Sequence, residues 1–199
     1  MKKKFWLIIS LCLLMLSFMT NPVYAMNKSN WYKTVLNTKN QIYHVKCWGA
    51  INRTEWVNRN KFHYYKIIDI NKDGTKELLL STMGTSSIVW GDQVLLLSYQ
   101  NGKVVPVGLI ALATVVELSC KGEYLCYYKR MAGFNGHDIY KFSNGKLKKV
   151  VSLNYDNYTI KNGKQTIIYR KNEKKCSEKI YKKYLKKYAL GRKISYKRI

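Results

Sequence analysis

The sequence predicts an α+β protein: an antiparallel β-meander with a short N-terminal helix and a basic, amphipathic C-terminal helix. Three observations lead to this fold class. Short runs rich in Val, Ile, Leu and Tyr follow one another from about residue 62 to residue 170, as in half-buried strands. Asn-Gly pairs join several of these runs, and apolar residues near the end of the chain have helical spacing. Hydrophobic residues make up 47% of the 199 residues, which excludes an intrinsically disordered chain.

Residues 1–25 have the pattern of a secretory signal peptide. Three lysines precede the apolar run Phe5–Met19, and Val23-Tyr24-Ala25 offers small residues at the −3 and −1 positions of a cleavage site. The run is shorter than the ~20 residues that span a bilayer. We therefore expect a secreted, extracytoplasmic protein with no transmembrane segment once the signal is removed. Retention of the segment as an N-terminal anchor is the alternative.

A domain from residue 26 to residue 170 follows the signal and begins with a helix. The segment Asn27–Asn40 is expected to be helical, with Ser29 as its N-cap and Trp31, Val35 and Leu36 on one face. Strands are expected from Phe62 onward. The expected strands are Phe62–Ile68, Glu77–Thr82, Gln93–Tyr99, Lys103–Leu109, Thr114–Ser119, Tyr124–Lys129, Asp138–Phe142, Lys146–Leu153 and Gln165–Arg170.

The turns specify how these strands pair. Asn and Gly both tolerate the positive φ that a two-residue type I′ hairpin turn requires at its two central positions. The sequence places such pairs at Asn101-Gly102, Asn144-Gly145 and Asn162-Gly163, and Lys121-Gly122 is a fourth hairpin signal. Together they predict that consecutive strands pair antiparallel.

Residues 171–199 form a basic C-terminal helix and tail. In Ser177–Ala189, Tyr181, Tyr184 and Tyr188 fall on one helix face and lysines on the other. The chain has 36 Lys and Arg against 11 Asp and Glu, a formal charge of +25, which attracts polyanions. Anionic cell-wall polymers, phospholipids, acidic glycans and nucleic acid are the candidate partners, without sequence-specific nucleic-acid recognition. The candidate polyanion-binding residues are Lys182, Lys183, Lys186 and Lys187.

The segment Tyr64–Leu80 contains the one chemical signature of the chain. Oxygen-bearing residues recur at alternate positions of a loop, and Gly74 supplies the backbone angle that closes it. Ca²⁺ prefers six to eight oxygen ligands. The candidate ligands are Asp69, Asn71, Asp73, the carbonyl of Thr75, and Glu77.

The flanking residues read as strands, and Leu80 stands where an EF-hand has a bidentate glutamate, so the segment is not a helix–loop–helix unit. The loop resembles the strand-flanked calcium loops of FG-GAP and VCBS-type repeats. It also resembles small exported bacterial proteins of uncharacterised role that carry one DxNxDGxxE loop after a Tyr-rich strand. The resemblance is specific only over Tyr64–Leu80, and it implies a Ca²⁺ site rather than an activity.

An alternative needs no metal. Asp and Asn side chains also close turns by accepting hydrogen bonds from nearby backbone N–H groups. Lys72 and Lys76 lie inside the loop and oppose cation binding. If Ca²⁺ binds, we expect an affinity on the order of 10⁻⁴–10⁻³ M, as in extracellular modules, and a structural role.

Four cysteines remain after the signal, and two disulfides or four buried free thiols are both compatible with them. They are Cys47, Cys120, Cys126 and Cys176.

The chain has no GxSxG, HExxH or phosphate-loop motif, and only three histidines. The expected function is therefore a secreted, non-catalytic binding or surface-interaction protein with a structural Ca²⁺ loop. A cationic wall-binding or polyanion-binding protein without metal is the first alternative, and a hydrolase with an unrecognised site is the second.

Overall fold

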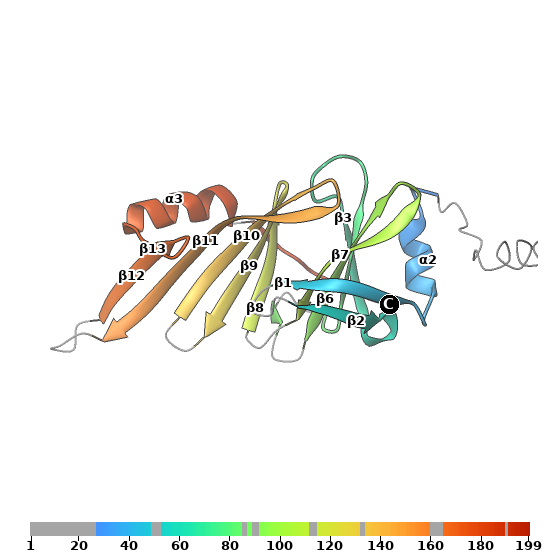
Figure 1. Ribbon diagram of the computed structural model, residues 1–199, viewed down its shortest axis with the longest axis horizontal. Coiled ribbons are helices and arrows are strands. Elements are labelled where there is room, and N and C mark those ends of the chain that lie inside the picture. The colour runs from blue at the N-terminus through green and yellow to red at the C-terminus, as the bar shows by residue number, and fades with distance from the viewer. Residues whose placement is uncertain are drawn as a thin grey trace, which may run out of the picture.

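The computed structural model describes residues 27–48, 53–84, 87–88, 92–111, 115–131, 134–159, 165–189 and 191–199. These residues form two β-sheets and two α-helices, which confirms the predicted fold class (Figure 1). The first sheet has the spatial order β15 (Lys197–Arg198), β3 (Tyr64–Ile68), β4 (Glu77–Ser81), β6 (Gln93–Gln100), β7 (Lys103–Ala111), β1 (Ile42–Trp48), β2 (Thr54–Asn58).

The second sheet is an antiparallel meander, as predicted. Its spatial order is β13 (Lys174–Lys175), β12 (Gln165–Lys171), β11 (Lys146–Thr159), β10 (Phe134–Ser143), β9 (Tyr124–Met131), β8 (Val115–Lys121), β14 (Arg192–Lys193), and β5 (Ser87–Ile88) also pairs with β8. The predicted domain boundary at residue 170 falls inside β12. The segment after it rejoins both sheets, because β14 pairs with β8 and β15 pairs with β3.

The prediction that strands begin at residue 62 is wrong, because β1 and β2 precede it. In β1 the residues alternate between buried and exposed, with Tyr43, Val45 and Cys47 buried. This is the period of a strand with one face in a core. The last residues of β1 pair in parallel with β7, through Cys47 opposite Leu109. The first sheet is therefore mixed rather than a pure meander.

The hairpin turns follow the sequence closely. Asn101 and Gly102 have φ angles of 48° and 77°, and Asn144 and Gly145 have 49° and 63°, as type I′ turns require. Gly122, with φ of 56°, joins β8 to β9. Asn162-Gly163 lies outside the described residues. A further hairpin between β12 and β13 turns at Asn172-Glu173, where both residues have positive φ without glycine.

Helix α2 (Trp31–Asn37) is shorter than predicted, and Ser29 is not its cap. Asn30 occupies the N-cap position without a side-chain hydrogen bond, and the Ser29 backbone N–H and hydroxyl both donate to Asn27 Oδ1. Helix α3 (Glu178–Tyr188) begins as predicted, because the Ser177 hydroxyl accepts a hydrogen bond from the Ile180 N–H.

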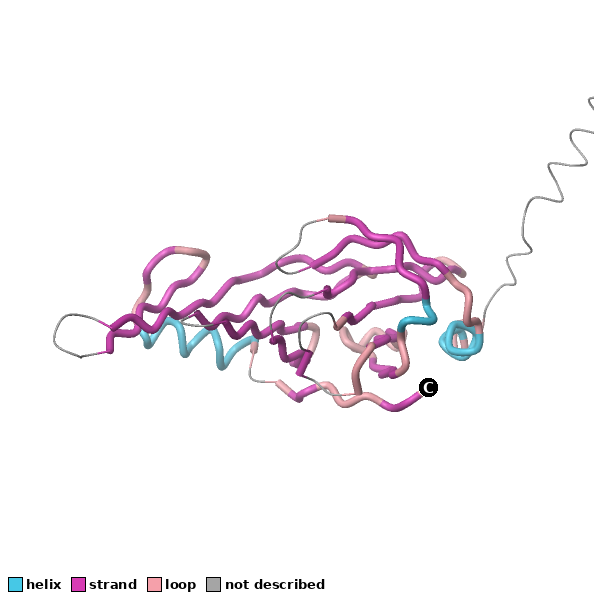
Figure 2. Tube along the Cα trace, turned by 90° about the horizontal axis from the view of Figure 1, so that it is seen from below, coloured by secondary structure: helices cyan, strands magenta, loops and turns pink. Residues whose placement is uncertain are grey.

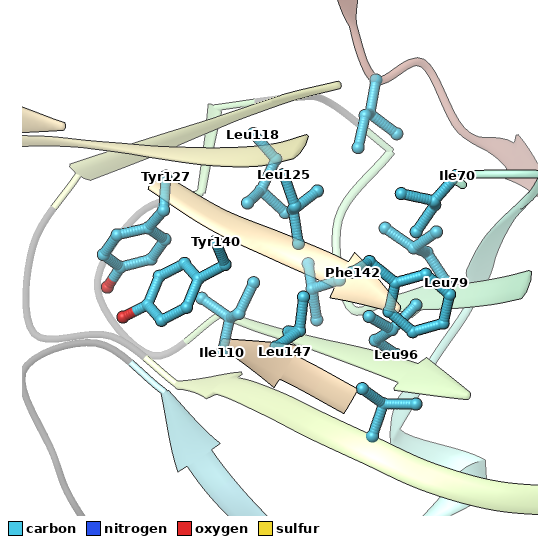
Figure 3. Packing of buried hydrophobic residues seen from close by; sticks show 13 residues of the cluster. Ile70, Leu79, Leu96, Ile110, Leu118, Leu125, Tyr127, Tyr140, Phe142 and Leu147 are labelled. Carbon is cyan, nitrogen blue, oxygen red and sulfur yellow. The ribbon is translucent and has the colours of Figure 1, made fainter. Parts of the chain in front are cut away.

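Three apolar cores hold these elements together. Between the two sheets, Leu118, Leu125 and Phe142 face Leu79 and Leu96 (Figure 3). Helix α2 packs on the first sheet, and α3 lies along one face of the second (Figure 2). Figure 1 places the two helices at opposite ends of the molecule.

The predicted signal peptide, residues 1–25, lies outside the described residues. Within the part of the chain that the structure describes, neither helix is long and apolar enough to cross a membrane.

Candidate functional site

The acidic loop connects β3 to β4, two antiparallel strands that end at the facing pair Ile68 and Glu77. Gly74 has φ of 83°, a conformation that glycine adopts without steric cost. Lys72 has φ of 60°, so the loop contains two left-handed residues. This geometry turns the chain back on itself and places the side chains of Asp69, Asn71 and Asp73 close together.

Hydrogen bonds within the loop hold these three side chains. Asp69 accepts through Oδ1 from the Asp73 N–H (3.2 Å) and through Oδ2 from the Gly74 N–H (2.9 Å). Asp73 accepts from the Thr75 N–H (2.7 Å) and from the Asn71 side-chain amide (2.7 Å). Burial acts to raise the pKa of Asp73, but the bonds from Thr75 and Asn71 outweigh it and lower the pKa.

Glu77 is placed differently from its neighbours. Its side chain is 1% exposed, with Oε2 accepting from the Ile70 N–H (3.0 Å) and Oε1 accepting weakly from the Ser98 hydroxyl (3.4 Å). Burial raises the pKa of Glu77 to about 7, and the charges of Asp73 and Asp69 add to the effect. The side chains of Asp69, Asn71 and Asp73 therefore lie together at the loop surface. Glu77 is buried, but it is close enough for the charges of Asp69 and Asp73 to raise its pKa.

The donor set is compatible with Ca²⁺. Each carboxylate oxygen that accepts one N–H retains another lone pair, so the loop hydrogen bonds do not use up its acceptors. Among the described residues, no Lys or Arg forms a salt bridge with Asp69, Asp73 or Glu77. Within the same residues, no group of three or more His, Cys, Asp or Glu side chains gathers closely enough to hold a metal. A Ca²⁺ site in this loop would therefore have to include the Asn71 amide oxygen and a backbone carbonyl as well as carboxylates.

The predicted cationic face lies on α3. Tyr181 and Tyr188 are buried against the second sheet, and the lysines on the opposite side of the helix are exposed. They are Lys182, Lys183, Lys186 and Lys187. Lys182 pairs with Glu178 (2.6 Å), so it is partly neutralised. Lys171 of β12 lies 3.9 Å from the ring centre of Tyr184 and extends the positive surface toward the sheet.

The four cysteines in the described part of the chain are free thiols. Cys47 lies in the core under α2, whereas Cys126 belongs to the core under α3 and Cys176 packs against it. Cys120 packs against the core between the sheets. Cys120 and Cys126 are on neighbouring strands but on opposite faces, so their side chains point apart. Of the four, only Cys126 and Cys176 share a core.

A pocket of about 230 Å³ contains Cys126 and His137, a pair that the sequence analysis did not identify. The pairing of β9 with β10 sets Tyr128 opposite His137, and this register brings Cys126 to the same face. Burial raises the pKa of Cys126 to about 12, so its sulfur is a thiol at neutral pH. Since the thiolate is the nucleophile, the pocket offers little support for a hydrolase.

Comparisons with known proteins assign no family. No protein-family model matches the chain, and no curated protein or solved structure matches it either. The resemblance of Tyr64–Leu80 to FG-GAP and VCBS-type calcium loops remains a prediction from the sequence.

Proposed function

We propose that this protein is a secreted, non-catalytic binding protein in which the β3–β4 loop takes up Ca²⁺ as a structural ion. The observation that carries the proposal is the grouping of Asp69, Asn71 and Asp73 without a salt-bridge partner among the described residues, in a chain with a formal charge of +25. Bound Ca²⁺ would supply the missing positive charge, and it would hold β3 and β4 in register.

Calcium should raise the melting temperature of the protein. With an affinity of 10⁻⁴–10⁻³ M, 10 mM Ca²⁺ would stabilise the folded state by roughly 1.4–2.7 kcal/mol. For a chain of this size, the shift would be about 3–10 °C. Thermal denaturation monitored by circular dichroism, with and without Ca²⁺, measures it.

Two variants test where the ion binds. Asp69→Ala and Asp73→Ala should abolish the calcium-dependent shift, whereas Glu55→Gln, which removes an acid far away on β2, should retain it. An equal shift in all four proteins would show that Ca²⁺ acts elsewhere. No shift in the wild type would leave the loop as a metal-free turn.

A second candidate function is binding of an anionic polymer, and the exposed lysines of α3 favour it. Their helix is docked by buried tyrosines, so the positive charges are fixed on one surface rather than carried on a mobile tail. An anionic polymer releases its counterions when lysines contact its phosphates, so binding of this kind weakens steeply with salt.

Substituting Lys183, Lys186 and Lys187 by Gln should weaken binding to poly(glycerol phosphate) and reduce its salt dependence. Each phosphate contact contributes roughly 0.7–0.9 to the slope of log K against log salt, so we expect a loss of about 2. A matched triple substitution of the exposed Lys46, Lys76 and Lys103 should change the slope less. Equal slopes in the two variants would mean that only net charge matters, and not α3.

A further inference from the structure

Arg59, in the short 3₁₀ helix after β2 (η1, Arg59–Lys61), is a buried cation with no acidic partner among the described residues. Its side chain is 4% exposed. The guanidinium donates to three backbone carbonyls, at Val35 (3.3 Å), Phe62 (3.2 Å) and Leu36 (2.7 Å). Two of these carbonyls lie in the last turn of α2, where the helix dipole is negative. Arg59 therefore ties α2 to the first sheet, although its full positive charge is not neutralised.

This arrangement leaves hydrogen-bonding capacity unused. A guanidinium has five N–H groups, and the three bonds to carbonyls leave two of them within the described part of the chain. Burying an ionised group without a counter-charge is costly, and burial lowers the pKa of Arg59. An anion beside it would offset that cost.

Arg59 lines a pocket of about 320 Å³ whose other ionisable side chains are also basic. Lys39 comes from the segment after α2, His63 from the segment before β3, and Arg198 from β15. The pairing of β15 with β3 brings Arg198 there, and the Ile199 N–H donates to the His63 carbonyl (2.9 Å). Three permanently positive side chains from distant parts of the sequence thus line one cavity, and the α-carboxylate of Ile199 is the one negative charge among the described residues of the same lining.

We propose that this pocket binds the phosphate group of a small organophosphate, with Arg59 as the buried contact and Lys39 and Arg198 at the exposed rim. A phosphate monoester carries nearly two negative charges, so it balances the net positive charge of this lining better than a carboxylate does. A guanidinium fork also fits phosphate oxygens in pairs. The apolar side chains of Leu36 and Phe62 line the same cavity and can contact the organic part of the ligand.

The pocket is independent of the two functions proposed above. Figure 1 places the C-terminus, which lines the pocket, beside α2, whereas α3 lies at the other end of the molecule. The β3–β4 loop does not contribute to its lining. Failure of the calcium or α3 experiments would therefore leave this proposal standing.

Isothermal titration of the full protein with glycerol 3-phosphate tests the proposal, with inorganic phosphate and acetate titrated in parallel. Saturable binding of both phosphate compounds, and weaker binding of acetate, is the expected result. Lys39→Gln and Arg198→Gln should each weaken glycerol 3-phosphate binding about tenfold, since each removes a charge-assisted hydrogen bond. Both residues are exposed, so these variants should fold normally. Lys33→Gln, on α2 and outside the pocket, should bind as the wild type does.

The source of the phosphate follows from competition. If poly(glycerol phosphate) displaces glycerol 3-phosphate, the natural ligand is a polymer unit, and if it does not, the ligand is a free organophosphate. Either outcome supports the pocket. The absence of saturable phosphate binding at 10 mM would overturn it, as would equal weakening by Lys33→Gln and Lys39→Gln.

Discussion

Replacing Glu77 with glutamine should stabilise the calcium-free protein by about 3 kcal/mol at pH 8 and leave its stability nearly unchanged at pH 4. The carboxyl group is buried beneath the acidic loop, where burial and the charges of Asp73 and Asp69 raise its pKa from 4.5 to about 7. Glutamine has nearly the same shape, and its amide oxygen can still accept the hydrogen bond from the Ile70 N–H.

The sign of the pH dependence follows from which state holds the proton. Between pH 4.5 and pH 7 the folded protein keeps a proton on Glu77 that the unfolded chain has lost. Glu77 therefore costs the wild-type protein no stability below pH 4.5. The free energy of unfolding falls as the pH rises from 4.5 to 7, and it stays low above pH 7. A shift of this size corresponds to about 3 kcal/mol, since each pKa unit is worth about 1.4 kcal/mol.

Urea denaturation of wild type and Glu77→Gln from pH 4 to pH 8 measures this effect. The difference between the two curves isolates Glu77, because all other titrating groups are common to both proteins. Glu55→Gln removes an acid from β2, an edge strand of the first sheet, and its pH dependence should match that of the wild type. Parallel wild-type and Glu77→Gln curves would show that the carboxyl is ionised without penalty. Added Ca²⁺ should reduce the wild-type loss at high pH, since a nearby cation favours the carboxylate.

The features that could be predicted from the sequence are those set by local chemistry. Asn101-Gly102 and Asn144-Gly145 favour tight antiparallel turns whatever surrounds them, so each specifies one hairpin, β6–β7 in the first sheet and β10–β11 in the second. Helix α3 was predictable for a similar reason, since its tyrosines recur at helical spacing and Ser177 caps it. The oxygen-rich loop was also local, because its ligand spacing lies within nine residues.

The features that could not be predicted depend on contacts between distant residues. The parallel pairing of β1 with β7 joins Cys47 to Leu109, and no turn signal connects them. The same is true of the Arg59 pocket, whose cations come from residues 39 to 198. Glu77 was predicted as a Ca²⁺ ligand from its spacing in the loop, but spacing does not predict that its position in β4 turns it toward the core between the sheets.

Replacing Tyr181 with alanine should give the largest loss of stability, about 3–4 kcal/mol, and should detach α3 from the second sheet. The ring is 4% exposed and packs against Tyr169 and Tyr155, with ring centres 5.0 and 5.9 Å away. Alanine leaves a cavity that these two tyrosines cannot fill without moving from their strands. Because short helices are stabilised mainly by packing, α3 should not persist once its anchor is lost.

Two measurements distinguish local detachment from global unfolding. Amide hydrogen exchange should speed up across α3 while the amides of β4, in the other sheet, keep their protection. Retention on poly(glycerol phosphate) should fall as well, although every lysine is still present.

Tyr181→Phe keeps the ring and loses only the hydroxyl contact with His137 Nδ1 (3.4 Å), so it should cost less than about 1 kcal/mol and bind the polymer as before. If Tyr181→Ala loses protection in α3 but retains the polymer fully, the fixed geometry of the lysines is not what the polymer recognises.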